Sequence, residues 1–448
     1  MAQATLPRKS MTVGGFQGPD QPDPEIMQRC IRCGLCLPSC PTYLETYSET
    51  SSPRGRIHLI QSVANGMLSI TDPGFVEQMY QCLDCRACEA TCPSGVRYGQ
   101  LVETARTQIE RARRRPPLQR ATRGLTFRGL FGDMRRFRGA SALMRFYQRS
   151  GAQRVARGSG ALRRMRLEGL EALLPAIPEN FVIPTDSLYP PADSQAVRGR
   201  VAMFAGCIMS TVFAETDRAT VRVLNANGYE VVMPQGQGCC GALGIHAGDM
   251  DNSRELARQN IAAFERSGAD VIIINAAGCG STLKEYGEIF AAEPEWHDRA
   301  RAFSERVRDV TEFLGELLTR GELNTSFTPI PLRVTYQEPC HLVHAQRISR
   351  QPRALLRAIP GLELVEMEES ALCCGSAGIY NVIRPDMAQR LGDRKARNAL
   401  ATEAQAVVTA NPGCHLQVRS SLQRAGSRIP VLHIVDLLDA AYRGHMPV

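Results

Sequence analysis

Two runs of sequence decide the fold of this chain: residues 30–41 read CIRCGLCLPSCP, and residues 82–93 read CLDCRACEATCP. Both runs have the spacing Cys-x2-Cys-x2-Cys-x3-Cys-Pro, which is typical of the ligands of a pair of [4Fe–4S] clusters. Three thiolates on one tight loop reach three corners of a cubic cluster, whereas the fourth Cys, followed by proline, reaches the other cluster. The predicted ligand sets are Cys30, Cys33, Cys36 and Cys92 for one cluster, and Cys82, Cys85, Cys88 and Cys40 for the other.

Other uses of cysteine fit this chain poorly. Structural zinc sites usually take two Cys-x2-Cys pairs, not three closely spaced Cys followed by Cys-Pro. Disulfide frameworks belong to small secreted domains, whereas this chain has 448 residues and begins without a hydrophobic export signal. No apolar run reaches the roughly 18 residues that a membrane helix needs. We therefore expect reduced cysteines in a cytoplasmic protein, with peripheral contact to the inner face of the cytoplasmic membrane as an open alternative.

Composition divides the chain into five parts. Residues 1–24 are rich in Gly, Pro, Gln and Asp, so we expect a mobile tail. Residues 25–110 carry both cysteine runs between short predicted helices and form the two-cluster ferredoxin-type domain. Residues 111–195 form an Arg-rich helical connector that ends in a Pro-rich linker. Residues 196–325 and 326–448 form two α/β modules.

The connector concentrates positive charge. Residues 111–170 hold seventeen Arg and two acids, a net charge of +15, although the whole chain carries +8. Such a patch favours an acidic partner or anionic lipid, and no nucleic-acid motif accompanies it. The alternative is a solvated helical linker that has no specific partner.

The two modules repeat one unit. Each copy has three predicted strands, and each strand is followed by Cys. The spacings between these cysteines agree to one residue, 32 and 40 in the first copy against 33 and 41 in the second. Strands alternate with helices, which predicts parallel sheets covered by helices. The predicted strands lie at 201–205, 229–233 and 270–275, and at 332–337, 362–367 and 406–410.

Ligand sites in such sheets lie just beyond the carboxyl ends of the strands, so four sulfurs should converge in each copy. A pseudo-two-fold arrangement of the copies would bring the two sites close together. The residues allow three occupants: an additional iron–sulfur cluster, zinc, or free thiols. This possible third site comprises Cys207, Cys239, Cys240 and Cys279 in the first copy, and Cys340, Cys373, Cys374 and Cys414 in the second.

Charged and imidazole side chains near the cysteines are candidates for auxiliary roles. Arg54 and Arg56 follow the first run and can compensate the negative charge of a thiolate-bound cluster, or simply cap a helix. Among the histidines, His344 is the strongest candidate for a ligand or proton relay, because we expect the two copies of the module site to enclose it. The other histidines near module cysteines are His246, His341 and His415.

Taken together, these motifs resemble a family in which two Cys-Cys-Gly modules follow a two-cluster ferredoxin domain. The family includes the Cys-Cys-Gly subunit of heterodisulfide reductase, the anchor subunit of anaerobic glycerol-3-phosphate dehydrogenase, and the iron–sulfur subunits of lactate and glycolate oxidation. The likeness is strongest to the glycolate oxidase iron–sulfur subunit. The segments that carry it are CIRCGLCLPSCPTY (30–43), SPRGRIHLI (52–60), CLDCRACEATCPSGVRYG (82–99), GCCGA (238–242), AAGCGSTLKEYG (276–287), CHLVHAQ (340–346) and LCCGSAG (372–378).

The resemblance implies a multidomain α+β and α/β fold, in which a helical two-cluster ferredoxin-like domain is followed by a duplicated parallel α/β cysteine-rich module. It also implies the electron-transfer subunit of a glycolate (2-hydroxy acid) dehydrogenase complex. FAD on partner subunits would oxidise the acid, and two [4Fe–4S] clusters would pass single electrons toward the quinone pool or another acceptor. We expect no catalytic residue on this chain, because the substrate site would lie on a partner.

Three alternative functions follow from the same resemblance: lactate oxidation, glycerol-3-phosphate oxidation, and an enzyme that reduces a disulfide at the Cys-Cys-Gly sites. The family's disulfide-reducing modules carry a fifth Cys, and this chain has Thr282 and Gln417 at those positions. The departure disfavours the disulfide-reducing alternative.

Overall fold

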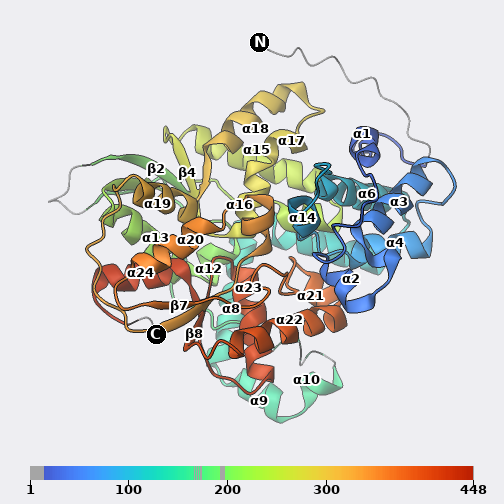
Figure 1. Ribbon diagram of the computed structural model, residues 1–448. Coiled ribbons are helices and arrows are strands. Elements are labelled where there is room, and N and C mark those ends of the chain that lie inside the picture. The colour runs from blue at the N-terminus through green and yellow to red at the C-terminus, as the bar shows by residue number, and fades with distance from the viewer. Residues whose placement is uncertain are drawn as a thin grey trace.

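The computed structural model describes residues 15–165, 167, 169, 171, 174–191 and 197–446. It confirms the expected fold class: a helical N-terminal unit lies beside two α/β modules (Figure 1). The part of the expected mobile tail that spans residues 1–14 lies outside the described residues. Every described helix is too short or too polar to span a bilayer.

The N-terminal unit is built from short helices that proline and capping residues start. Proline stands in the first turn of the first four α-helices, where its missing N–H costs nothing. The side chains of Asp23, Ser52 and Asp72 cap three of these helices. Ile60 and Met79 are fully buried in the core of the unit. The elements are α1 (Pro24–Gln28), α2 (Pro41–Thr46), η1 (Glu49–Ser51), α3 (Pro53–Ala64), α4 (Pro73–Gln81), α5 (Ala87–Ala90) and α6 (Tyr98–Ala112).

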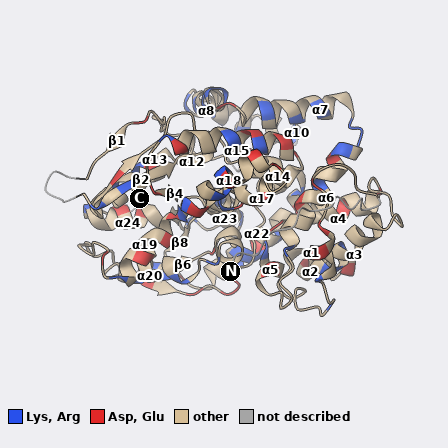
Figure 2. Cartoon of the chain, turned by 90° about the horizontal axis from the view of Figure 1, so that it is seen from above, with Lys and Arg blue, Asp and Glu red and all other residues tan. Residues whose placement is uncertain are grey.

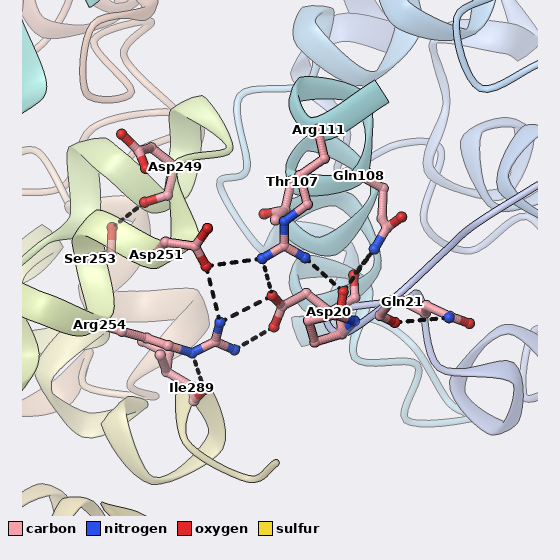
Figure 3. Close-up of polar contacts among 12 residues, drawn as sticks. Asp20, Gln21, Thr107, Gln108, Arg111, Asp249, Asp251, Ser253, Arg254 and Ile289 are labelled. Atoms are coloured by element: carbon pink, nitrogen blue, oxygen red, sulfur yellow. Dashed lines mark hydrogen bonds and ion pairs between the residues drawn. The ribbon is translucent and has the colours of Figure 1, made fainter. Parts of the chain in front are cut away.

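Residues 15–23 are packed against the rest of the protein, which corrects the prediction of a mobile tail that extends to residue 24. The Phe16 side chain is 2% exposed and belongs to the core of the N-terminal unit. The Asp20 carboxylate accepts hydrogen bonds from Arg111 of α6 (2.7 Å) and from Arg254 of the first module (3.0 Å), as Figure 3 shows. Gln108 donates to three backbone carbonyls of the same segment. The composition resembles a disordered tail, but ion pairs with distant residues hold this segment in place.

The connector is helical, as predicted, and two of its helices, α7 (Pro117–Arg123) and α8 (Met134–Arg149), lie along one edge of the molecule in Figure 2. The Pro-rich linker after it runs over the surface and ends in β1 (Leu188–Tyr189), which pairs antiparallel with a strand of the first module. Val182 of the linker is buried and donates its N–H to the carbonyl of Ser210. The connector elements are α7 (Pro117–Arg123), the π-helix η2 (Gly124–Leu130), α8 (Met134–Arg149), α9 (Ala152–Gly158) and α10 (Ala161–Arg164).

The first module is a five-stranded sheet with the strand order β1-β3-β2-β4-β5, and all its pairings except that of β1 are parallel. β2 is central, so that Val201 pairs with Val231 on one side and Val271 on the other. Its elements are β2 (Gly199–Phe204), α12 (Ile208–Thr211), α13 (Ala214–Ala226), β3 (Tyr229–Val232), α14 (Ala242–Ala247), α15 (Met250–Glu265), β4 (Val271–Ile274), α16 (Ala277–Lys284), α17 (Tyr286–Ile289), α18 (Pro294–Arg306), β5 (Val307–Asp309) and α19 (Val310–Thr319).

The second module is a four-stranded parallel sheet with the order β7-β6-β8-β9. The sequence predicts three strands in each copy, and the structure adds a fourth, β5 or β9, at the corresponding edge. Each of these strands has only three residues, too few for an alternation pattern to show. The elements are β6 (Arg333–Tyr336), the π-helix η3 (His341–Ala345), α20 (Arg350–Ala358), β7 (Glu363–Val365), α21 (Tyr380–Ile383), α22 (Pro385–Leu400), β8 (Ala406–Thr409), α23 (Pro412–Arg424), β9 (Val431–His433) and α24 (Ile434–Arg443).

The two modules share one hydrophobic core. Met203 of β2 and Val334 of β6 belong to the same buried cluster, whereas Phe204, on the opposite face of β2, packs under the helices of its own module. The contacts between the copies are reciprocal: α13 packs on α24, and α20, the counterpart of α13, packs on α19. Reciprocal contacts of this kind are what a pseudo-two-fold axis produces, as the duplicated sequence predicts.

Candidate functional site: two cysteine-lined cavities and two thiol quartets

Two neighbouring cavities inside the N-terminal unit are lined by the two cysteine runs. Pro53 and Tyr98 border both cavities, so the two spaces share a wall. All sixteen cysteines of the chain are free thiols. The thiols therefore suit the predicted clusters chemically, and the structure places them in the predicted sets; ligation itself stays a prediction. One cavity is lined by Cys30, Cys33, Cys36 and Cys92, and the other by Cys40, Cys82, Cys85 and Cys88, with Cys88 also bordering the first.

The two cysteine loops repeat the same unusual backbone. Arg32 and its counterpart Asp84 have positive φ angles of 58° and 53°, and Gly34 and its counterpart Arg86 have φ angles of 87° and 62°. A left-handed conformation costs a residue with a side chain roughly 1–2 kcal/mol. The second loop bears that cost twice, at Asp84 and at Arg86. Its turn places the backbone N–H of Asp84 so that it donates to Cys82 Sγ at 3.3 Å.

Arg56 is buried between the thiols of the second cavity, as expected for a charge-compensating residue. Its side chain is fully buried and donates to the carbonyl of Gln78 (2.8 Å) and to Thr42 Oγ1 (3.1 Å). Burial alone would lower the pKa of Arg56, but the neighbouring Tyr98, Cys82 and Cys40 side chains raise it above its usual value. The guanidinium therefore stays charged beside these sulfurs.

Arg54 borders the other cavity and is more exposed. It donates to Glu49 at 2.7 Å and to the carbonyl of Arg32 at 3.2 Å. Its own backbone N–H, in the first turn of α3, donates to the Cys36 thiol. The positive end of this helix therefore faces a predicted ligand, while Glu49 neutralises much of the side-chain charge.

Four sulfurs converge in each module, as the duplication predicts. In the first module, Cys240 and Cys279 lie 3.2 Å apart at Sγ, just beyond β3 and β4. A hydrogen bond from the Cys207 thiol, together with one from Cys240, holds the pKa of Cys239 well below its usual range. In the second module, the corresponding contacts join Cys340 to Cys373 (4.0 Å), Cys373 to Cys374, and Cys374 to Cys414.

The glycine of each Cys-Cys-Gly motif is required by the backbone. Gly241 and Gly375 have φ angles of 88° and 89°, a conformation that strains any residue with a side chain. At Gly375, a Cβ would also lie 2.6 Å from the carbonyl oxygen of Ala388. The motif therefore shapes the loop that presents two adjacent thiols.

The positions of the missing fifth cysteines are filled. Thr282 is 4% exposed, and its hydroxyl donates to the carbonyl of Gly278. Gln417 is 3% exposed and donates to the carbonyl of Ala388. These hydrogen-bonded side chains leave each module a four-sulfur set, which disfavours a five-cysteine site.

The thiol quartet of the second module, and not that of the first, lies against a cysteine loop of the N-terminal unit. Cys85 shares a buried cluster with Cys373, and Cys340 packs against that cluster. His341, next to Cys340, donates from Nε2 to the carbonyl of Asp84, next to Cys85, at 2.8 Å. This hydrogen bond links the loop of one cavity to the segment that carries Cys340 of the second module.

The first module's quartet is covered by the connector instead. Cys207 and Cys239 form a small buried cluster with Phe137 of α8 and Leu256 of α15. The two quartets therefore have different neighbours, although they come from copies of one unit.

A buried charge cluster lies at the junction between the N-terminal unit and the first module, and the sequence analysis does not predict it. Arg86 is 5% exposed and pairs with Glu285 (2.8 Å), Glu103 (3.0 Å) and Asp84 (3.4 Å). His246 Nδ1 lies 3.1 Å from the same Asp84 carboxylate. Burial opposes the ionisation of Asp84, yet Arg86 and His246 hold its pKa well below the usual range. A weak signal existed in the sequence: Arg86 occupies the position where the first loop has Gly34.

The structure places each of the candidate histidines. His344 donates to the carbonyl of Ala371, beside the Cys373 loop of its own module, at 3.0 Å, and its auxiliary role stays a prediction. His246 and His341 meet across the junction, with ring centroids 5.5 Å apart. Burial lowers the pKa of His341 to about 4, so this imidazole is neutral. His415 packs edge-on against Phe213.

Comparison with known families supports each region of the chain. Residues 26–96 match the 4Fe-4S dicluster domain, and residues 201–284 and 334–419 match the cysteine-rich domain. The connector, residues 118–174, matches the linker region of the glycolate oxidase iron-sulfur subunit.

Whole-chain relatives agree with the domain matches. The probable glycolate oxidase iron-sulfur subunit of Bacillus subtilis is 43% identical over 91% of this chain and 92% of its own length. The glycolate oxidase iron-sulfur subunit of Escherichia coli is 32% identical over 93% of this chain and 94% of its own. Lactate utilization protein A of Oceanobacillus iheyensis is 28% identical and matches 55% of this chain and 98% of its own length. This chain is an iron–sulfur protein that belongs to the family of glycolate oxidase iron–sulfur subunits.

Proposed function

We propose that this chain is the electron-transfer subunit of a flavin-dependent glycolate dehydrogenase complex. FAD on a partner subunit oxidises the 2-hydroxy acid, and this chain carries the electrons toward a quinone or another acceptor at the inner face of the cytoplasmic membrane. The observation that carries the proposal is the pair of adjacent four-cysteine cavities, one of which adjoins a further thiol quartet. The names of the relatives point to glycolate.

The residues of each cavity suit the storage of one electron at a time. A [4Fe–4S] cluster bound by four thiolates supplies one-electron chemistry, which complements the two-electron chemistry of a flavin. Cys30, Cys33, Cys36 and Cys92 would hold one cluster, and Cys40, Cys82, Cys85 and Cys88 the other. Arg56 keeps a positive charge beside the second set, and Tyr98 donates to Cys82 Sγ at 3.6 Å. Both groups favour added negative charge on that set.

The contact between Cys85 and the second module suggests where electrons leave or enter the pair of clusters. Cys373 lies in the same buried cluster as Cys85, Cys340 packs against that cluster, and the His341 hydrogen bond to Asp84 fixes the two loops relative to each other. A redox-active occupant of the second quartet would therefore exchange electrons with the cluster at Cys85. The quartet can equally hold zinc or remain as thiols, and then the route would end at the cluster.

Anaerobic metal analysis and flavoprotein capture test the function together. Two clusters require about eight iron per chain, and about twelve or more would place a cluster in a module as well. A co-expressed flavoprotein that copurifies with the chain should reduce it when glycolate is added. Reduction by lactate or glycerol 3-phosphate but not by glycolate would reassign the substrate. A chain that binds about eight iron yet accepts no electrons from any such flavoprotein would refute the proposed partner.

A further inference from the structure

The outer surface of the connector exposes arginines and large apolar side chains together. The arginines on it that make no hydrogen bond or ion pair through their side chains with any residue that the structure describes include Arg113, Arg114, Arg120, Arg135 and Arg154. Six large apolar side chains between residues 118 and 165 are at least 60% exposed: Leu118, Leu125, Leu143, Phe146, Val155 and Met165. We call these eleven residues the outer connector surface.

The helix α8 shows that this exposure is one-sided. Phe137 and Ser141 face inward, and Phe137 packs over Cys207 and Cys239 of the first module. On the opposite side of the same helix, Leu143 and Phe146 are 70% and 68% exposed. A helix that already has one buried face gains nothing for its own folding from a second apolar face. The outward apolar side chains therefore call for an external partner.

The pattern fits a lipid surface better than a protein partner. Stable protein interfaces are built around one contiguous, well-packed apolar centre. Here the apolar side chains are scattered over several short helices, and arginines lie between them. Arginine beside Leu and Phe on a surface helix is the arrangement by which amphipathic helices lie in the headgroup region of a bilayer. Figure 2 shows α7 and α8 along one edge, with Lys and Arg colouring prominent on both.

We propose that the outer connector surface docks this chain on a bilayer of anionic phospholipid. The arginines contact lipid phosphates, and the leucines and Phe146 enter the interface between headgroups and acyl chains. The proposal goes beyond electron transfer, since it assigns a lipid-binding surface. It rests on the exposure and charge of the connector and not on the identity of the substrate.

Vesicle sedimentation with the full, cluster-loaded chain tests this surface. The wild-type chain should bind vesicles of phosphatidylglycerol and phosphatidylcholine, bind phosphatidylcholine alone weakly, and lose most binding at high salt. The variant R113Q/R120Q/R135Q should lower the partition coefficient about a hundredfold, since each arginine near an anionic surface contributes about fivefold. The variant L143S/F146S should lower it about tenfold.

Matched variants elsewhere control for net charge and folding. R301Q/R320Q/R397Q removes three exposed arginines outside the connector, and V382S/I383S removes two exposed apolar residues of α21. Neither should change vesicle binding by more than about twofold beyond the effect of net charge. Equal losses in connector and control variants, or no vesicle binding by the wild type, would overturn the proposal. So would connector variants that bind vesicles normally but no longer capture the flavoprotein. No substrate or electron transfer enters this assay, so its outcome is independent of the proposed function.

Discussion

Replacing the buried guanidinium of Arg56 by Met should make the cluster at Cys40, Cys82, Cys85 and Cys88 harder to reduce. Thr42 Oγ1 lies 3.1 Å from Arg56 Nη2 and 3.3 Å from Cys40 Sγ, so the positive charge lies within about 6 Å of that sulfur. A unit charge at about 6 Å in an effective dielectric constant of about 20 contributes about 3 kcal/mol. Since about 1.4 kcal/mol corresponds to about 59 mV for one electron, the reduction potential should fall by about 120 mV.

The assay is an anaerobic redox titration followed by electron paramagnetic resonance. Arg56→Lys keeps the charge and should shift the potential by less than half as much. Arg54→Met is the matched control: Arg54 is partly exposed and paired with Glu49, so its removal should shift the other cluster by less than about 40 mV. Arg56→Met also leaves the Gln78 carbonyl without its donor, at a cost of about 1–3 kcal/mol in stability. Only variants with full iron content are therefore compared. An unchanged potential in a fully loaded Arg56→Met chain would refute the electrostatic role.

Three further predictions concern the ligand sets, the pH dependence and the Cys-Cys-Gly loops. If Cys40 and Cys82 hold the same cluster, the double variant Cys40→Ser/Cys82→Ser should lose no more than the roughly four iron of one cluster. The double variant Cys40→Ser/Cys30→Ser should instead lose about eight, because it removes a ligand from each cluster. The opposite result would mean that Cys40 and Cys92 each belong to the other cluster. His433 is buried, donates to the Asn275 carbonyl at 2.9 Å and accepts from the N–H of Val435, and burial lowers its pKa to about 3. Its unfolded-state pKa is about 6.5, so the unfolded chain takes up the proton first as the pH falls, and His433 alone should contribute about 2 kcal/mol to the native-state stability lost between pH 8 and pH 5. His433→Asn can still cap α24 and should remove that contribution from urea titrations at the two pH values, whereas His297→Asn, at a partly exposed histidine, should not. Parallel pH dependence in all three chains would contradict the assignment. Gly375→Ala should destabilise the chain by about 1–3 kcal/mol more than Gly241→Ala, because the new Cβ meets the Ala388 carbonyl in addition to the backbone strain that both variants share. Thermal unfolding of the two variants measures this difference. Equal losses of stability would mean that the Gly375 loop moves to accommodate the Cβ.

The cysteine-lined sites could be predicted because their information is local. The spacing inside each run fixes which thiols share a loop, and the nearly equal spacings within the modules, 72 residues from Cys207 to Cys279 and 74 from Cys340 to Cys414, show the duplication. The packed segment around Asp20 could not be predicted in the same way. Its partners Arg111 and Arg254 lie 91 and 234 residues away, and no local pattern encodes such pairs.

The charge cluster at the junction was hidden for a related reason. Glu103, Glu285 and His246 come from three elements that only the tertiary fold brings to Arg86. Each of these residues is ordinary in its own helix or loop. The fourth strands β5 and β9 escaped because three residues carry too little pattern.

The N-terminal unit breaks the symmetry that the duplication would impose. Two copies related by a pseudo-two-fold axis offer equivalent thiol quartets, yet one cysteine loop cannot lie equally close to both. The loop at Cys85 lies against Cys340 and Cys373, and Phe137 of the connector covers Cys207 and Cys239. We therefore infer that the copies have diverged in role: the second quartet lies next to a predicted cluster, while the first supports the connector. If both quartets exchanged electrons with the clusters alike, Cys373→Ser and Cys239→Ser would perturb the spectrum of the Cys85 cluster equally. The packing predicts that only Cys373→Ser perturbs it.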